Sequence, residues 1–528
     1  MHVLVINGSP SGKNSITLQT VLFIEKHFKK INFKYLHVGS GIHAMEKSFA
    51  EAEDALRSAD LLLFAYPVYT FLVPSQLHRF IELIKEHGMD LSGKYATQLT
   101  TSKHFYDTTA HQFIEDNCDD LGLRYITGLS ADMEDLLNKK GQTEALKFFR
   151  YVCWNMKHGL YEPARYASPS RDTVDAGSCS NGSPDPQDTA TADSGSSGLP
   201  DTQDTATADP GSCGLPDTQD TAADPGGSGL PIPQNTATAN PNSNELTDSR
   251  NTVNDYSPSL ETSSKGASKR IVVITDLPAD GSGTALADMI DRFRENVSCT
   301  CDVVNIREFP FKGGCLGCFH CAADGTCIYK DGFDSYLRNN IQSSDAIVYA
   351  YTIRDHSMGS RFKMFDDRQF CNGHRTVTMG KPVGYLVEGD LANEPNLITL
   401  MEARAQVGGN FLAGIAVSGI DMEREVNQLA LRICYAADHA YNPPKNFYGV
   451  GGLKIFRDLI YQMQGMMKED HRFYKEHGFY DFPQKRKGTI VGMYLVGAMM
   501  SNKKLRRKLG NKMTEGMLMP YKKILEKI

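Results

Sequence analysis

The feature that most constrains this chain is the order of its first residues: an apolar strand, a small polar loop and the start of a helix. Val3 to Ile6 form a continuous apolar run, the pattern of a strand buried on both faces of a parallel sheet. The loop 7–15 follows, with two glycines, several hydroxyl and amide side chains and one lysine, and a helical pattern begins at Ile16. Free backbone N–H groups and the helix dipole favour an anion at such a junction. We expect a phosphate cradle here, with an ordinary polar turn as the alternative.

The spacing within this loop excludes two better-known phosphate-binding motifs. Gly8 and Gly12 are too close together for a Walker A loop, and Asn14 stands where that motif needs Ser or Thr after its lysine. The G-x-G-x-x-G fingerprint of dinucleotide-binding loops does not occur in it either.

Two further loops at predicted strand ends carry residues suited to a flat ring. The apolar run Leu61–Ala65 leads into aromatic and small residues at 66–71, and the strand pattern Tyr95–Thr100 leads into polar and aromatic residues at 101–107. In doubly wound sheets, ligands bind in the crevice outside the carboxyl ends of the strands. The three loops together therefore predict a site for one phosphate and one planar ring system.

The motifs in these loops, G-S-P-x-x-x-N-S, Y-P-V-Y-T and T-S-x-H-F-Y-D, resemble those of the NAD(P)H-dependent FMN reductases of flavodoxin-like fold, over about residues 1–160. The resemblance implies FMN as cofactor and NAD(P)H as electron donor. The residues expected to bind FMN are Ser9, Ser11, Lys13, Asn14, Ser15, Pro67, Val68, Tyr69, Phe71, Thr101, Ser102, His104 and Tyr106. We identify no catalytic acid, base or nucleophile, because the flavin itself performs the hydride and electron steps in such proteins.

Between Tyr166 and Ser268 the composition changes completely. This segment is rich in Asp, Thr, Ala, Pro, Gly and Ser, lacks hydrophobic periodicity and carries the acidic excess behind the net charge of −7. Related units begin at Gly182, Gly198, Gly214 and Gly229. Such a composition buries too little apolar surface to offset the ordering of the chain. We predict a long disordered repeat linker, with a repeat solenoid as the alternative.

After the linker the first pattern recurs. Ile271–Thr275 again forms an apolar strand after two basic residues, and Ser343–Tyr351 parallels Ser58–Tyr66. Each half alternates strands with helical patterns, which implies parallel strands and right-handed crossovers. The chain is therefore predicted to contain two diverged copies of one α/β domain, which the resemblance makes two flavodoxin-like, doubly wound parallel sheets.

The second copy differs from the first at its predicted phosphate loop. Asp276 replaces Gly8, and Asp280 takes the place of Gly12. Two carboxylates beside a phosphate would repel it. The stretch Phe362–Arg368 still resembles a helix of the family. We expect FMN to bind in the first copy, and the sequence leaves open whether the second copy binds another.

Four of the twelve cysteines of the chain lie in one short run of the second copy, with the spacing C-x2-C-x2-C-x5-C. They are Cys315, Cys318, Cys321 and Cys327. Three thiolates on one tight loop, with a fourth returned by a glycine turn, suit a compact iron–sulfur cluster. The run also resembles that of the iron–sulfur flavoproteins, which implies a 4Fe-4S cluster. The alternatives are structural zinc, whose four-cysteine sites usually pair two C-x2-C knuckles across a longer loop, and thiols without a metal.

The tail from Asn446 to Ile528 extends beyond the flavodoxin-like pattern and has helical periodicity. Its stretch Ile490–Met500 is apolar but about half as long as a membrane span requires, and a basic cluster follows at 503–508. A helix that packs its apolar face on the domain is the commoner case for such a stretch, and contact with a membrane surface is the alternative. The N-terminus leads directly into a strand, so no signal peptide is visible and a cytoplasmic protein is expected.

These observations predict four parts: an FMN-binding domain over 1–165, the linker over 166–268, a second flavodoxin-like domain with the cysteine run over 269–445, and a basic helical extension over 446–528. Electrons from NAD(P)H would pass by way of FMN and the cluster to a small-molecule or protein acceptor, and no nucleic-acid partner is expected. The resemblance suggests that the two copies pair as a pseudo-dimer within the chain, with the cysteine run near the FMN of the first copy; a homo-oligomer is the alternative. The rival hypothesis is a non-enzymatic, flavin-containing redox sensor or docking scaffold.

Overall fold

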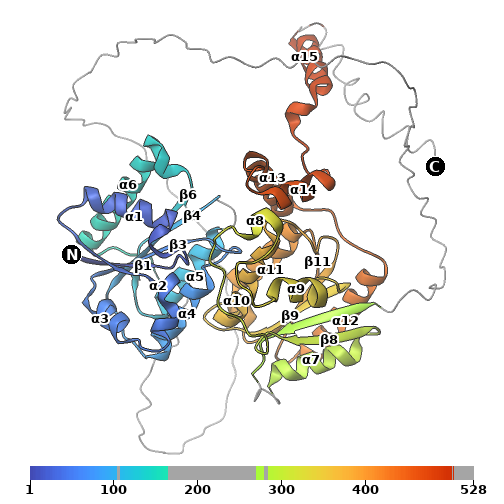
Figure 1. Ribbon diagram of the computed structural model, residues 1–528, viewed down its shortest axis with the longest axis horizontal. Helices are drawn as coiled ribbons and strands as arrows, with labels where there is room; N and C mark the ends of the chain where they lie inside the picture. The colour runs from blue at the N-terminus through green and yellow to red at the C-terminus, as the bar shows by residue number, and fades with distance from the viewer. Residues whose placement is uncertain (104–106, 164–268, 279–283, 502–503, 505–528) are drawn as a thin grey trace, which may run out of the picture. The chain divides into compact units, whose positions relative to one another are not determined.

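The computed structural model of the protein describes residues 1–103, 107–163, 269–278, 284–501 and 504. The predicted linker over 166–268 lies outside these residues, and so do two of the predicted FMN-binding residues, His104 and Tyr106. The described residues contain two parallel β-sheets within one compact unit (Figure 1).

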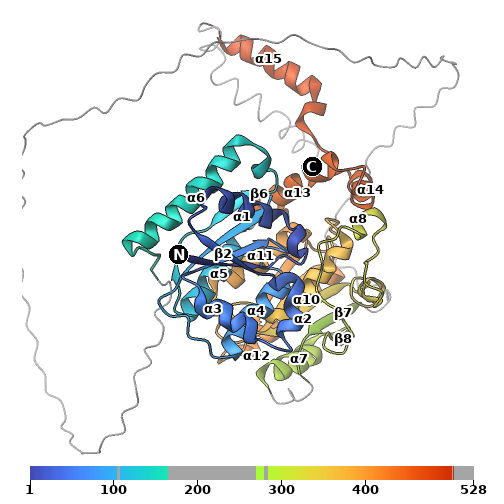
Figure 2. The same cartoon turned by 60° about the vertical axis from the view of Figure 1, so that its left-hand side comes forward.

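The first sheet forms because successive residues of its strands are apolar on both faces. In β1, Val3 packs on one side with Leu18 of α1, and Leu4 packs on the other side with Leu56 of α3. Helices α1 and α6 therefore cover one face and α3 and α4 the other (Figure 2). The elements are β1 (His2–Asn7), α1 (Ile16–His27), β2 (Asn32–Leu36), α2 (Val38–Met45), α3 (Ala50–Ser58), β3 (Leu61–Pro67), α4 (Ser75–Glu86), β4 (Tyr95–Ser102), α5 (Asp107–Asp120), β5 (Arg124–Tyr125), β6 (Leu129–Asp132) and α6 (Lys139–His158), with short 3-10 turns η1 (Gly12–Asn14) and η2 (Asp135–Leu137).

The second sheet is built in the same way. Val273 of β7 packs with Met289 of α7 and Leu429 of α12, and Val272 faces the opposite side with Phe362 of α10. The elements are β7 (Arg270–Thr275), α7 (Ala285–Asn296), β8 (Thr300–Asn305), α8 (Cys321–Asp324), α9 (Phe333–Tyr336), β9 (Ala346–Thr352), α10 (Gly359–Arg368), β10 (Pro382–Glu388), α11 (Pro395–Gly408), β11 (Phe411–Val417) and α12 (Met422–Asp438), with the turns η3 (Leu337–Ile341), η4 (Gln369–Asn372) and η5 (Leu391–Asn393).

Both sheets have the strand order of a flavodoxin-like fold. The first runs β2-β1-β3-β4-β5, with β6 paired to β4, and the second runs β8-β7-β9-β10-β11. Every strand pairing that the structure describes is parallel. Order 2-1-3-4-5 places the topological switch point between the first and third strands, where ligands bind outside the carboxyl ends. The prediction of two doubly wound α/β domains is confirmed.

One hydrophobic cluster joins the two domains. It contains Leu77 and Phe80 of α4 as well as Phe362 and Phe365 of α10. The turns before these helices also match, because Thr70 and Phe71 in one domain and Asp355 and His356 in the other all have positive φ. The α4 face of the first domain thus packs on the equivalent α10 face of the second, as in a pseudo-symmetric dimer.

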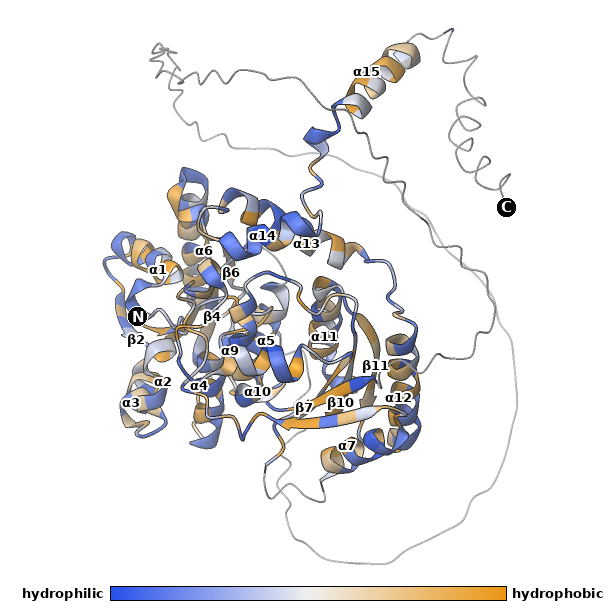
Figure 3. Ribbon diagram, turned by 45° about the vertical axis from the view of Figure 1, so that its right-hand side comes forward, coloured by the Kyte–Doolittle hydropathy of each residue, from blue (hydrophilic) through white to orange (hydrophobic). Residues whose placement is uncertain are grey.

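The tail is helical, as predicted. Helices α13 (Phe447–Gln462) and α14 (Lys468–Glu476) precede the turn η6 (Pro483–Lys485) and α15 (Lys487–Ser501). Tyr474 of α14 is fully buried in a cluster with Ile460 and with Ala322 of α8, so this part of the tail packs beside the cysteine run. Helix α15 is rich in apolar residues (Figure 3), and several of their side chains are exposed, for example that of Leu495. Within the part of the chain that the structure describes, no helix is both long enough and apolar enough to span a membrane.

Candidate functional site

The predicted phosphate loop is held in shape by Asn7 at the end of β1. Its Oδ1 accepts a hydrogen bond from the Ser9 amide at 3.2 Å, and its Nδ2 donates to the Gly12 carbonyl at 2.9 Å. The Ser15 hydroxyl caps α1 by accepting from the Leu18 amide at 3.4 Å. Ser9 and Ser15 are buried, whereas three predicted residues are exposed at the start of the helix: Ser11, Lys13 and Asn14. The exposed side chains and the helix N-terminus together provide the donors that a phosphate needs.

A residue that sequence reasoning missed supports this loop from behind. Gly39, in α2, lies so close that a Cβ atom built on it would be 2.1 Å from the Ser9 carbonyl oxygen and 2.6 Å from that of Gly8. Only glycine allows this contact. A single sequence gives little indication of this role for a helical glycine, because the contact forms only when α2 packs on the loop in the folded protein.

The second loop follows β3 and turns tightly. The amide and carbonyl groups of Tyr69 and Leu72 bond each other at 2.8 and 2.9 Å, and positive φ at Thr70 and Phe71 lets the chain reverse. The predicted residues Pro67, Val68, Tyr69 and Phe71 are all half-buried. The Val68 amide donates to the Thr101 carbonyl at 3.3 Å, so this loop lies directly beside the third.

In the third loop the predicted hydroxyl side chains are engaged in the fold. Thr101 is buried and its hydroxyl lies 2.6 Å from that of Thr17 in α1. Ser102 donates to Asp107 Oδ2 at 3.2 Å. The three loops follow β1, β3 and β4, which are neighbours in the sheet, and the structure therefore brings them together. Their role in binding FMN stays a prediction.

The cysteine run of the second domain lies against these loops of the first. The Ser11 hydroxyl donates to the Leu316 carbonyl at 3.4 Å, and Gln76 Nε2 donates to the Cys315 carbonyl at 3.3 Å. Gly317, at φ +61°, is in such close contact with Tyr69 that a Cβ atom there would be 1.8 Å from the phenol oxygen. The loop that carries the cysteines is thus seated between the phosphate loop and the ring loop.

Tyr69 is enclosed by residues of the second domain. Its ring meets that of Phe370 edge-on at 5.4 Å, and Lys363 Nζ donates to its carbonyl at 3.0 Å. Burial is the main reason that the pKa of its phenol is raised, and the nearby Cys315 adds to it. Tyr69 is therefore a contact to the cysteine run as well as a part of the ring loop.

Arg368, which is almost fully buried, anchors the cysteine run to its own domain. Its guanidinium forms a two-pronged ion pair with Asp331 at 2.8 and 2.9 Å and also donates to the Gly313 carbonyl at 2.9 Å. It lies over the Tyr329 ring at 4.5 Å, and its Nη2 is 3.9 Å from Cys327 Sγ. Arg368 belongs to the stretch 362–368 noted in the sequence, but its partners were not apparent from that stretch.

Two of the cysteine thiols make contacts with backbone groups. The Gly317 amide donates to Cys315 Sγ at 3.5 Å, and Cys321 Sγ donates to the Phe370 carbonyl at 3.1 Å. Burial raises the pKa of the Cys321 thiol to about 11, with nearby cysteines as the next contribution. Among the described residues, no three of these sulfur atoms lie within 4.8 Å of one another. The four thiols are a donor set that can ligate an iron–sulfur cluster or a zinc ion.

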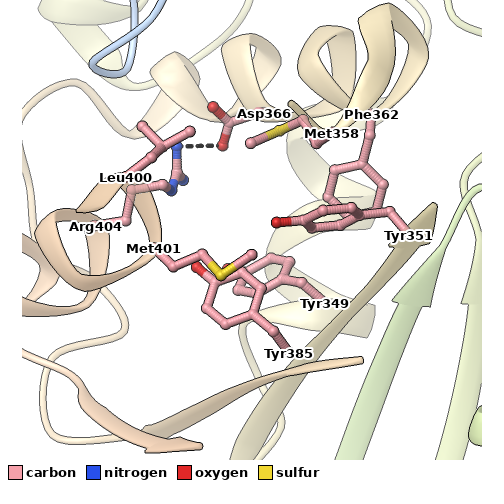
Figure 4. Close-up of a pocket in the computed structure, with 9 residues that line it drawn as sticks. All are labelled: Tyr349, Tyr351, Met358, Phe362, Asp366, Tyr385, Leu400, Met401 and Arg404. Atoms are coloured by element: carbon pink, nitrogen blue, oxygen red, sulfur yellow. Dashed lines mark ion pairs between the residues drawn. The ribbon is translucent and has the colours of Figure 1, made fainter. Parts of the chain in front are cut away.

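The core of the second domain leaves no room for a cofactor beside its third strand. The cavity there measures about 10 Å³, which is space for about one water molecule. Figure 4 shows it between Tyr349, Tyr351, Tyr385 and the ion pair of Asp366 with Arg404, whose atoms are 2.5 Å apart.

The fold and the loop geometry define a pair of flavodoxin-like domains, with a candidate ligand site in the first domain and a cysteine run of the second domain beside it. Residues 1–113 match the family model of NADPH-dependent FMN reductases, and this confirms the resemblance seen in the loop motifs. The matched family supports an oxidoreductase. An iron-sulfur flavoprotein of Archaeoglobus fulgidus is 27% identical over 174 residues, which are 31% of this chain and 79% of that protein.

Solved structures of flavin-linked oxidoreductases are also similar to parts of the chain. An NADH:FMN oxidoreductase in its apo form is 20% identical and aligns with 33% of this chain and 99% of its own, with a TM-score of 0.27. An FMN-dependent NADH-azoreductase from Bacillus anthracis, in complex with FMN, is 14% identical and aligns with 30% of this chain and 99% of its own, with a TM-score of 0.23.

Proposed function

We propose that this protein is an NAD(P)H-dependent flavin oxidoreductase that binds FMN in its first domain and holds an iron–sulfur cluster on the cysteine run of its second domain. The observation that carries this proposal is the contact of the cysteine run with both flavin loops, through Leu316 to Ser11 and through Gly317 to Tyr69. A redox group on this loop would be adjacent to a flavin in the first domain. The final acceptor would be a small molecule or a protein.

FMN and the iron–sulfur cluster would each supply redox chemistry that the side chains lack. FMN accepts a hydride and an iron–sulfur cluster carries single electrons, so together they convert a two-electron donor into a one-electron source. The residues of the chain bind and position these groups. Ser11, Lys13, Asn14 and the N-terminus of α1 would hold the flavin phosphate, and the four cysteines would ligate the cluster.

Burial raises the pKa of the Cys315 and Cys321 thiols, and two contacts of the cysteine run oppose this effect of burial. Arg368 brings a buried positive charge to 3.9 Å from Cys327, and the Gly317 amide points at Cys315. Both contacts stabilise thiolates, which are the form that binds metal. Metal binding would release the protons that burial otherwise keeps on these thiols.

Titration of the purified full-length chain with FMN tests the flavin site. Lys13→Glu with Asn14→Asp should weaken FMN binding at least about tenfold, because both changes place negative charge beside the phosphate. Lys29→Glu with Asn32→Asp makes the same charge change at exposed positions away from the loops and should leave binding intact. Unchanged affinity in the first variant would show that FMN binds elsewhere. Tight FMN binding without NAD(P)H oxidation would favour the redox sensor or docking scaffold.

A further inference from the structure

The second domain carries an unusual charge at its own switch point. Arg307, Arg354 and Arg361 line one cavity of about 860 Å³ together with Asp276 and Lys312. Asp276 follows β7 at the position that Gly8 occupies after β1, since both β-strands end one residue earlier. The cavity is of the size that holds a small organic ligand.

The three arginines occupy positions at which the first domain has no charge. Arg307 follows β8 where Gly39 follows β2, as the registers of the two strand pairs show. Arg354 and Arg361 match Tyr69 and Gln76, because the turn bonded between Arg354 and Ser357 repeats the turn bonded between Tyr69 and Leu72. The second domain has thus exchanged three neutral residues around one loop for three guanidinium groups.

These guanidinium groups are close together and incompletely paired. Arg307 donates to the Asp276 carbonyl, and its Nη2 lies 3.8 Å from the Asp276 carboxylate. Arg361 reaches the carbonyls of Ile306 and Arg307 only at 3.4 Å, and its buried Nε has no partner. Among the described residues, no acceptor lies within hydrogen-bonding distance of the Arg354 guanidinium or the Lys312 ammonium group. Among the described residues of the second domain, this cavity wall therefore has four cations and two carboxylates, Asp276 and Asp355.

The other charges of the cavity wall reduce this imbalance but do not remove it. On the first-domain side, Arg79 pairs with Glu46, Glu82 and Glu86 at 2.6 to 3.3 Å. Lys85 pairs with Asp355 at 2.9 Å. Arg79 and Lys85 thus stand against four carboxylates, so six cations and five carboxylates line the cavity as a whole, with four of the cations on the side of Asp276. From the sequence we expected an acidic loop here, because Asp276 lies in the loop itself. The three arginines lie in other segments, and only the folded structure brings them beside the loop.

We infer that the arginine-lined side of this cavity, which faces Pro10 of the first domain's phosphate loop across the cavity, is a second binding site for a phosphate-bearing organic anion of about nucleotide size. Guanidinium groups bind phosphate oxygens in pairs of parallel hydrogen bonds, and three of them around one space match a diphosphate or a bisphosphate. Such a ligand could be a nicotinamide nucleotide or another phosphorylated small molecule, which share this chemistry. The site does not depend on the flavin chemistry proposed above.

Calorimetric titration of the full-length protein with pyrophosphate, after one equivalent of FMN has been added for the first-domain loop, tests the inference. Arg354→Gln with Arg361→Gln should weaken pyrophosphate binding at least about tenfold, since each guanidinium contributes a charge-assisted contact. Arg294→Gln with Arg424→Gln removes the same charge from exposed residues that pair at 3.6 and 3.1 Å with Asp291 and Asp421, and should change the affinity less than about twofold. Equal affinities for wild type and the cavity variant, or no binding by the wild type, would overturn the inference.

Two further experiments identify the kind of ligand and distinguish this site from the phosphate loop of the first domain. Adenosine 2′,5′-bisphosphate binding more tightly than pyrophosphate would support a nicotinamide nucleotide, and equal or weaker binding would support another phosphorylated small molecule. The Lys13→Glu, Asn14→Asp variant should keep its pyrophosphate affinity. Loss of pyrophosphate binding in that variant would assign the phosphate to the first domain and overturn the second site.

Discussion

The Ser75 amide donates a hydrogen bond of 2.8 Å to Asp367 Oδ2, and this bond ties the first turn of α4 in one domain to α10 in the other. The reverse contact is also present, because the Ser360 amide of α10 donates to Glu82 of α4 at 2.7 Å. Each helix thus caps the N-terminus of its equivalent with a carboxylate, as two subunits do across a two-fold axis. The predicted pairing of the two copies within one chain is built around this reciprocal cap.

Replacing Asp367 should destabilise the pairing strongly. Asp367 is fully buried and also binds Lys363, which is itself fully buried and would keep only the more distant Asp366, at 3.8 Å, as a counter-ion. Removing one partner of a buried ion pair typically costs about 3–5 kcal/mol, so Asp367→Ala should lower the free energy of unfolding by about that amount in urea. Asp421→Ala removes an exposed carboxylate paired with Arg424 and should cost less than about 1 kcal/mol. Similar unfolding midpoints for the two variants would count against the reciprocal cap.

The close approach of α2 to the phosphate loop predicts a selective effect on flavin binding. Gly39→Ala should weaken FMN binding at least about tenfold, because the new methyl group would push the Ser9 carbonyl and shift the loop. Gly41→Ala in the same helix meets only the end of Met45, at 3.7 Å, and should bind FMN like the wild type. Fluorescence titration with FMN compares them. Equal affinities would show that Gly39 does not shape the site.

The contact of Gly317 with Tyr69 predicts a separate effect on the cysteine run. Gly317→Ala should displace the run from the ring loop, and Tyr69→Phe in the same protein should partly restore it by removing the phenol oxygen. Gly332→Ala introduces a side chain at a similar positive φ with nothing within 4 Å, and therefore reports the backbone strain alone. Hydrogen exchange over 313–328 is the measurement. Equal exchange in the Gly317 and Gly332 variants would show that the contact with Tyr69 does not hold the cysteine run in place.

A histidine between the domains predicts a pH dependence of stability. Burial alone would lower the pKa of His356, but its bonds to Asp120 and Glu394, at 3.0 and 2.9 Å, raise the pKa to about 10. Because the pKa in the folded state lies above the ordinary value near 6.5, the stabilisation is complete below that value and is lost as the pH rises through 10. Thermal unfolding from pH 6 to 10 should show a falling midpoint that flattens in His356→Gln. Parallel curves for the two proteins would contradict this role.

The fold and the position of the candidate site could be predicted from the sequence because their signals are local. A buried strand such as Val3–Ile6 is a continuous apolar run, and the polar loop after it follows directly along the chain. The repeat of this pattern at Ile271–Thr275 was enough to predict a second sheet. Strand order then follows from the handedness of the connections.

The residues that the sequence did not reveal depend on contacts between distant segments. Gly39 touches a loop thirty residues before it, Arg368 joins residues that lie up to 55 positions away, and Arg307, Arg354 and Arg361 meet only in the folded second domain. Single positions of this kind leave no periodic pattern. The placement of the cysteine run against Ser11 was expected from the pairing of domains, but the atoms that make the contact were not.

The most direct test of the central claim is the transfer of electrons in protein purified without oxygen and reduced with NADPH. Cys318, an exposed member of the run, can be changed to Ala with little effect on packing, and Cys153→Ala in α6 serves as the control. Stopped-flow absorption should show intact FMN reduction in Cys318→Ala but transfer to ferricyanide slowed at least about tenfold, while the control matches the wild type. Unchanged transfer in Cys318→Ala, or the absence of iron from the wild-type protein, would contradict the account and leave a flavin reductase without a cluster.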